Sequence, residues 1–305
     1  MQGYLTRRIA HSLVALLGVT LVAFVFVNAS GDPAALLLPG DATPAQAAAL
    51  RRSLGLDRPF LTQYGLFVWQ AVHGNFGVSF RQQLPAAPLI LSYAPATAEL
   101  AVGASVVSVV VAVPLGIIAA SYRGRLYDWL TSVFVLIGQS APIFWLGLMA
   151  IWIFSLELRL LPPFGRGTLA QLVLPVMTLA WYVSALLTRM TRASMLEVLD
   201  QDYIRTARSK GLSWLPVILK HALRNAAIPV LTVFGLQFGE LLGGVVVTET
   251  VFAWPGMGRA IVDAINARDY PVVLAGVVVL ATIFVAVNLL VDLSYGLLDP
   301  RIRYQ

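Results

Sequence analysis

A glutamine and a glutamate interrupt an apolar stretch over residues 226–247. They are Gln237 and Glu240, and both lie near glycines that recur every four residues in this stretch. A carboxylate inside a membrane is costly and usually faces a cavity or a partner. Both residues are therefore candidates to line a path or a gate, although Glu240 is equally placed to reach the outer membrane surface. Gln139 and Asn288, in two other apolar stretches, are candidates of the same kind.

The sequence lacks the motifs of several enzyme classes. Neither lysine has the context of a phosphate-binding loop, because each follows a serine or a leucine in Ser209-Lys210-Gly211 and Leu219-Lys220-His221. The three histidines are far apart, no GxSxG motif occurs, and cysteine is absent. We expect a non-catalytic chain that holds no cofactor or metal, with any ATP and magnesium bound by another chain.

The composition is that of a membrane protein. The chain has 305 residues, of which 58% are hydrophobic and 12% charged, and its mean hydropathy is +0.80. A soluble domain carries about 25% charged residues, so an ordinary soluble enzyme and a disordered protein are both excluded. The net charge of +6 is spread along the chain and not gathered in one soluble basic region. We expect membrane lipid, and no nucleic acid, around this protein.

The apolar stretches predict the fold class. A membrane helix needs about 20 mostly apolar residues. Six stretches fit: residues 9–29, 97–120, 129–156, 171–188, 226–247 and 271–293. We therefore expect an all-α polytopic membrane protein with six transmembrane helices. Pro114 and Pro142 should kink their helices, because proline removes a backbone donor.

This pattern divides the chain into four segments. They are an N-terminal transmembrane helix (1–30), an extracytoplasmic loop region with short interfacial helices (31–96), a core domain of five helices (97–293) and a cytoplasmic tail (294–305). Within the loop region, apolar residues from Phe60 to Trp69 recur at helical spacing. The helix they predict is either a cap without a contact role or a docking surface for a partner.

Small residues recur every four positions in three of the stretches. They are Ala104, Ser108 and Ala112; Ala180, Ser184 and Thr188; and Gly235, Gly239 and Gly243. Such stripes let a second helix approach closely. The partner is either another helix of the same bundle or a second subunit.

The basic residues indicate which ends face the cytoplasm. Thirteen Arg and Lys lie before the first stretch, near 121–128, in the loop over 189–225 and after the last stretch, whereas eight lie in the longer loops of the other side. Cytoplasmic loops carry the excess of positive charge. We therefore expect both termini and the loop over 189–225 to be cytoplasmic.

That cytoplasmic loop contains a short predicted helix over residues 200–211. Asp200 or Asp202 can accept the free amides at its start, and Gly211 can end it in a left-handed conformation. At its end, Arg208 and Lys210 complement the helix dipole. Its apolar residues Tyr203, Ile204 and Ala207 fall on one face at helical spacing. The helix is either a solvated loop element or a knob that fits a groove on a cytoplasmic partner.

The same loop resembles the EAA loop of ABC importer permeases, most closely in the dipeptide, oligopeptide and nickel branch. The resemblance lies in Asp202–Leu212 and in His221–Pro229. Aligned on Gly211, the Glu-Ala-Ala of the general motif is replaced by Arg205-Thr206-Ala207, and the proline comes later, at Pro229. The glutamate of the general family therefore cannot be assigned here.

Other short motifs support the resemblance by their order and spacing. They are Gly31-Asp32-Pro33, Gly55–Pro59, Gly74–Ser79, Glu249–Gly258, Arg268–Pro271 and Leu298–Arg301. Together with the loop they cover nearly the whole chain. The early Gly-Asp-Pro and the long outer loop resemble the first, or B-type, permease subunit of such systems.

The resemblance implies a type I ABC importer permease in the inner membrane of a bacterium. It implies a second homologous permease subunit, two ATPase subunits or one fused ATPase chain, and an extracytoplasmic substrate-binding protein. ATP-driven closure of the ATPases would move the loop helix and, through alternating access, import di- or oligopeptides. The alternatives are a permease for nickel or another solute, and a stand-alone secondary transporter or channel using Glu240.

The resemblance also assigns candidate residues. The ATPase-coupling residues are Asp202, Tyr203, Ile204, Arg205, Thr206, Ala207, Arg208 and Gly211. The candidates for contact with the binding protein are Phe252, Trp254, Pro255 and Met257. These four have two other interpretations, which are that they brace the outer gate and that Trp254 anchors the chain at the membrane surface.

Overall fold

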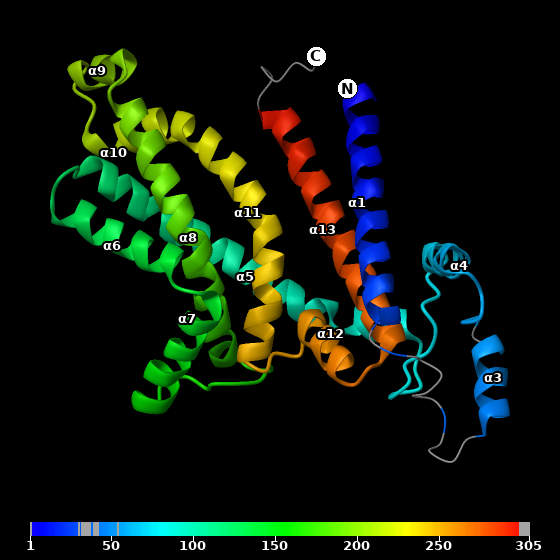
Figure 1. Cartoon of the computed structure of the whole chain (residues 1–305). Helices are drawn as coiled ribbons and strands as arrows, with labels where there is room; N and C mark the ends of the chain where they lie inside the picture. Colours follow the sequence, from blue (N-terminus) through cyan, green and yellow to red (C-terminus); the bar gives the residue numbers. More distant parts are fainter. Residues whose placement is uncertain (1, 30, 32–37, 39–42, 54, 299–305) are drawn as a thin grey trace. The chain divides into compact units, whose positions relative to one another are not determined.

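A computed structural model of the chain describes residues 2–29, 31, 38, 43–53 and 55–298. These residues form helices and connecting segments, and the one isolated β-bridge among them joins Val78 to Pro85. Among the described residues, five helices are long and apolar enough to cross a membrane, and the number is six if a bent pair of helices is one span (Figure 1). The all-α polytopic prediction is confirmed, with one of the six spans broken.

The chain forms two compact units. The first contains residues 2–95 and 256–286, and the second contains residues 96–255 and 287–298. Two long helices, α5 (Ala86–Ser121) and α13 (Tyr270–Leu298), contribute residues to both units. The structure thus groups most of the last span with the first unit, whereas the sequence placed it in a core domain over 97–293. The predicted tail begins inside α13, and its residues 299–305 lie outside the described part of the chain.

The first unit is built on α1 (Gln2–Ala29) and the first turns of α13. It also holds α3 (Pro44–Ser53), α4 (Phe60–Val72), the start of α5 and α12 (Met257–Asn266). Val27, Ile90, Met257 and Tyr270 pack into its apolar core. The buried carboxylate of Asp269 accepts hydrogen bonds from the Ser79 hydroxyl at 2.5 Å and from the Phe80 amide at 3.0 Å. These bonds fix the end of the outer loop to the start of α13.

The second unit contains the remaining helices. They are α6 (Leu126–Ser140), α7 (Ile143–Ala150), the π-helix η1 (Ile151–Glu157), α8 (Leu169–Leu199), α9 (Asp202–Ser209), α10 (Trp214–Pro216), the π-helix η2 (Val217–Ala222) and α11 (Leu223–Val251). A capping box between Thr168 and Gln171 starts α8. Because α8 packs against both α6 and α11, it forms the centre of this unit.

The third predicted span, 129–156, is broken at Pro142. The axes of α6 and α7 differ by 112°. Ala141, before the proline, has an extended backbone with ψ 132°, as the ring of the next residue requires. The predicted kink is therefore a break between two separate helices. By contrast, α5 continues as one helix through Pro114.

Small side chains allow the close packing inside the second unit. All six residues of the predicted stripes on α5 and α8 are buried. A Cβ added to Gly116 of α5 would lie 2.5 Å from the Thr191 Cβ of α8, so the two helices nearly touch there. On α11, Gly235 and Gly239 are buried, while Gly243 is exposed on this chain.

The candidate coupling helix and its seat

The predicted loop helix is present as α9, at the end of α8 (Figure 1). Gly211 has φ +79°, so the predicted left-handed ending is confirmed. The predicted cap is wrong. Gln201 occupies the N-cap position without a side-chain cap bond, and Asp200 ends α8 instead. Asp202 lies inside the first turn, where its negative charge still favours the helix dipole.

The apolar residues of α9 face the chain's own core. Ile204 is fully buried and Ala207 is 8% exposed. They pack into a cluster, here called the seat, formed by Ile117 and Ala120 of α5, Met195 of α8, Val217, Ile218 and Ala222 of η2, and Ala226 of α11. Ile204 and Ala207 therefore cannot insert into a partner, as one of the sequence interpretations required. They attach α9 to three membrane helices.

The outward face of α9 is polar and cationic, with one aromatic ring. Tyr203 is 42% exposed, and its hydroxyl accepts a hydrogen bond from the Asn225 amide at 2.8 Å. Arg205 lies 3.4 Å from Asp202, and both side chains are largely exposed. Thr206 and Arg208 are exposed as well. Just beyond Gly211, three large apolar residues are also exposed: Leu212, Trp214 and Leu215.

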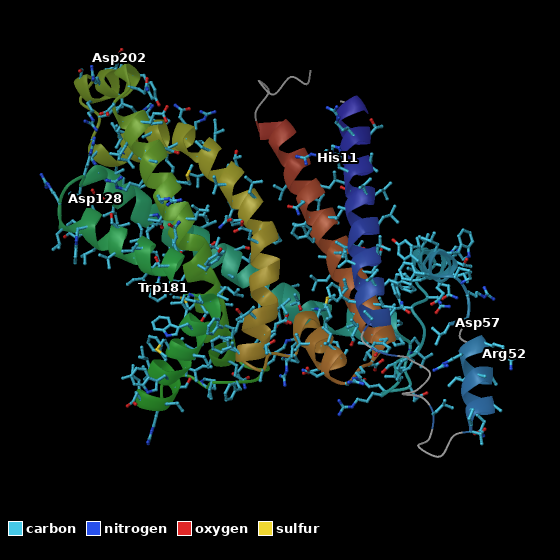
Figure 2. The ribbon with its side chains drawn as sticks, in the orientation of Figure 1. His11, Arg52, Asp57, Asp128, Trp181 and Asp202 are labelled. Carbon is cyan, nitrogen blue, oxygen red and sulfur yellow. The ribbon has the colours of Figure 1, made fainter. Side chains whose placement is uncertain are left out.

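An ion pair ties α6 to α8 on the same side of the unit as α9. Arg192 of α8 donates two hydrogen bonds to the Asp128 carboxylate, at 2.7 and 2.9 Å. The Gly124 amide donates to the same carboxylate at 3.0 Å. Asp128 is buried and lies in the first turn of α6 (Figure 2). This bidentate arrangement fixes the relative rotation of the two helices.

The opposite end of the second unit holds a buried polar cluster that the sequence prediction missed. The Thr97 hydroxyl of α5 donates to the Glu249 carboxylate of α11 at 2.6 Å, and Glu249 is fully buried. The Trp254 indole donates to the Ala96 carbonyl at 2.9 Å. Glu249 opens one of the recognised sequence motifs, but its partner lies 152 positions away in sequence, which no local pattern reveals.

Arg166 lies beside this cluster on the loop before α8. Its guanidinium forms an ion pair with Glu99 and stands 6.0 Å from the Trp254 ring. The hydrogen bonds that Arg166 donates to the Glu99 carboxylate raise the pKa of Arg166 above its ordinary value. Both ends of this pair are partly exposed, so it positions the loop more than it stabilises the fold.

The predicted path residues do not form a single described cluster. Gln237 is buried on α11, whereas Glu240, one turn on, is exposed. Gln139 is exposed at the end of α6 and accepts a hydrogen bond from Arg189 of α8 at 3.1 Å. Asn288 is half-buried on α13. Glu240 and Gln139 remain candidates because each presents a polar side chain on the outside of this chain.

The loop after α11 has little side-chain surface to offer a binding protein. Phe252 and Trp254 are each 1% exposed, and they pack inside the second unit. Met257 is also 1% exposed and packs inside the first unit. Pro255 is exposed. These positions favour the bracing interpretation for the three buried residues and leave Pro255 as the accessible one.

The described residues contain no group of three His, Asp or Glu placed to hold a metal ion. The described contacts of α9 connect helices to one another, so the arrangement can transmit movement between them. A small helix is attached through two buried side chains to α5, α8 and α11, and an ion pair extends the connection to α6.

Two solved structures have a similar fold. A chain of the crystal structure of an amino acid ABC transporter with histidines gives a TM-score of 0.51 at 18% identity, covering 70% of this chain and 94% of its own. A chain of the MetNI methionine ABC transporter in inward-facing conformations gives a TM-score of 0.58 at 19% identity. The match covers 69% of this chain and 96% of that chain. The chain therefore has the fold of an ABC importer permease.

Sequence comparisons identify the family. The model described as binding-protein-dependent transport system inner membrane component matches residues 112–304, and that of the N-terminal part of such components matches residues 1–101. The chain belongs to this family. It is 43% identical to the dipeptide transport system permease protein DppB of Alkalihalophilus pseudofirmus and 42% identical to the glutathione transport system permease protein GsiC of Escherichia coli, over the whole of both chains in each case.

Proposed function

We propose that this chain is the permease subunit of an ATP-driven importer of dipeptides and other short peptides. Its relatives carry the names of dipeptide and glutathione systems, and glutathione is itself a short peptide. In this proposal the chain forms half of a translocation path with a second permease. ATP hydrolysis takes place on separate ATPase subunits, and a binding protein delivers the substrate. The chain lies in the bacterial inner membrane with both termini in the cytoplasm.

The observation that carries the coupling part of the proposal is the seating of α9. Ile204 and Ala207 attach the helix to the core, while Tyr203, Arg205 and Arg208 remain available outside. An ATPase that holds the outward face would move α9, and the seat would pass that movement to α5, α8 and α11. A stand-alone transporter using Glu240 is not favoured, since it gives α9 no role.

The test is uptake by the assembled importer in vesicles, with labelled dipeptide added outside and ATP inside. Ala207→Glu places a charge in the seat, and Gly211→Pro forbids the left-handed backbone. Each should lower the number of peptides imported per ATP hydrolysed by about tenfold or more, because the link between the two events is broken. Ala207→Ser and Gly211→Asn are the matched controls, and both should retain coupling, because serine is small and asparagine tolerates a positive φ.

Wild-type coupling in Ala207→Glu and Gly211→Pro would overturn the assigned role of α9.

The substrate class is tested separately by competition. Unlabelled short peptides, including glutathione, should displace the labelled dipeptide, whereas a nickel chelate should not. Displacement by the chelate alone would overturn the peptide assignment and make the chain a nickel permease of the same branch.

A further inference from the structure

Helix α4, in the loop region after α1, carries no charged side chain. Its sequence FLTQYGLFVWQAV contains only apolar residues, glycine and uncharged polar residues. Charged residues occur just before it, at Asp57 and Arg58. An outer-loop helix in water would be expected to expose charges, as α3 does with Arg51 and Arg52.

One face of α4 packs on α1. The Phe24 ring of α1 lies 5.5 Å from the Phe60 ring, 5.7 Å from the Tyr64 ring and 5.4 Å from the Phe67 ring. The Tyr64 hydroxyl donates to the Leu17 carbonyl at 2.9 Å. Figure 1 shows α4 beside the half of α1 that ends at Ala29.

These contacts fix the depth of α4 in the bilayer. The apolar stretch of α1, residues 9–29, spans about 32 Å at 1.5 Å per residue, close to the hydrocarbon thickness of about 30 Å. Leu17 is therefore near the bilayer centre, and Phe24 is about 10 Å nearer the surface. A helix that touches both residues lies at the depth of lipid tails.

The faces of α4 that do not touch α1 differ in polarity. Leu61 and Val72 are each 78% exposed and Trp69 is 66% exposed, and at helical spacing the three share one side of the helix. Thr62, Gln70 and His73 follow on the next side of the helix, together with Leu66, which is 40% exposed. The side-chain amide nitrogen of Gln63 and the hydroxyl of Tyr64 are already hydrogen-bonded within the chain.

The exposed apolar side has the character of a lipid-facing surface. It consists of large side chains, whereas helix contacts inside membranes favour small ones. It also continues the exposed apolar surface of α1, where Leu13 and Leu17 are about half exposed. In water, such a surface would be an aggregation hazard.

We propose that α4 is inserted in the leaflet nearest Ala29, with Leu61, Trp69 and Val72 solvated by lipid acyl chains and Thr62 and Gln70 turned toward the headgroups. The outer loop is thus partly a membrane element. Its α4 is not a docking surface for a water-soluble partner.

The absence of cysteine makes the test direct, because single cysteines can be introduced without removing others. Nitroxide labels at Leu61→Cys and Val72→Cys are measured in the full chain, assembled in its importer, in vesicles of phosphatidylethanolamine and phosphatidylglycerol. Collisions with oxygen report lipid, and collisions with a water-soluble nickel complex report water. Leu13→Cys on α1 is the lipid reference, Ala48→Cys on α3 the water reference and Ile90→Cys the buried reference.

Both labels on α4 should resemble Leu13→Cys, with oxygen collisions several-fold above those with nickel. Nickel access equal to that at Ala48→Cys would overturn the proposal and place α4 in water. Low access to both reagents, as at Ile90→Cys, would also overturn it, because a protein partner would then cover this side.

A second experiment introduces a negative charge on either side of α4. Val72→Glu should reduce membrane retention of α4 and raise nickel access at Leu61→Cys, whereas Gln70→Glu on the headgroup side should change neither.

Discussion

At the scale of single residues, the pair of Asp128 and Arg192 is a well-formed polar link on the same side of the second unit as α9. The carboxylate is buried and accepts three hydrogen bonds, two of them from one guanidinium. Breaking such a pair leaves a charge without its partner in a poorly solvated place. The pair of Asp202 and Arg205 on α9 is the opposite case, because water surrounds both of its side chains.

This difference predicts a double-mutant result. Asp128→Asn and Arg192→Gln should each lower the free energy of unfolding by about 1–3 kcal/mol, and the double variant should cost clearly less than their sum. The corresponding changes at Asp202 and Arg205 should interact by less than about 0.5 kcal/mol. Thermal unfolding in detergent measures both cycles. Additive losses at Asp128 and Arg192 would contradict the pairing.

Sequence reasoning succeeded at the residue scale where a backbone requirement is local. Gly211 was predicted because a helix end needs a left-handed residue, and its φ is +79°. It failed for the apolar face of α9, because spacing shows that Ile204 and Ala207 share a side but not what covers that side. The seat is assembled from residues between Ile117 and Ala226, and this assembly requires tertiary structure.

At the scale of elements, the packing of α5 on α8 depends on the absence of a side chain. Gly116 faces Thr191, and a Cβ there would also lie 3.0 Å from the Thr188 carbonyl. Neither of the two threonine hydroxyls has a hydrogen-bond partner among the described residues, and both are buried. The contact is therefore made by shape and not by polar pairing.

Gly116→Ala should separate these helices and destabilise the chain by about 1–3 kcal/mol, since an added methyl group in a tight contact forces a shift. Gly18→Ala is the matched control on a membrane helix. A Cβ at Gly18 meets no described atom within 4 Å, so the change should be neutral or slightly stabilising. Thermal unfolding of the isolated chain in detergent compares the two. Equal stabilities would show that α5 and α8 do not approach as described.

Among the elements, the membrane-spanning helices were predicted best, because a long run of apolar residues is enough to indicate them. The spans near the start and end of the chain required only the count of apolar residues. The corner at Pro142 was predicted as a kink, but its 112° angle was not, because a proline permits a bend without determining its size. The small-residue stripes on α5 and α8 were correctly expected to pack closely, and the structure shows that they pack within one unit.

At the scale of the whole molecule, the distribution of Arg and Lys sets the expected orientation. Seven of the 21 basic residues lie between Arg189 and Arg224, around α9. The insertion machinery retains such segments on the cytoplasmic side. On this expectation α9 lies on the side where ATPase subunits would bind, and α3 lies on the opposite side of the membrane.

Cysteine labelling in intact cells tests this orientation. Thr206→Cys on α9 should react with a membrane-impermeant maleimide only after the membrane is permeabilised, whereas Thr43→Cys should react from outside, since both side chains are exposed. The unaltered chain provides the blank, because it has no cysteine. Reaction of Thr206→Cys in intact cells would invert the proposed topology.

The part of α8 between Val176 and Met195 has a geometric consequence for the two sites that it joins. Met195 contributes to the seat of α9, and Val176 contributes to the core that holds Trp254, so one helix joins two sites separated by 19 positions. That separation is about 28 Å along the axis, and no proline interrupts it. If the seat end tilts by about 10° while the helix stays rigid, the far end moves by about 5 Å. A rigid α8 would therefore carry a small displacement of the seat to the core around Trp254.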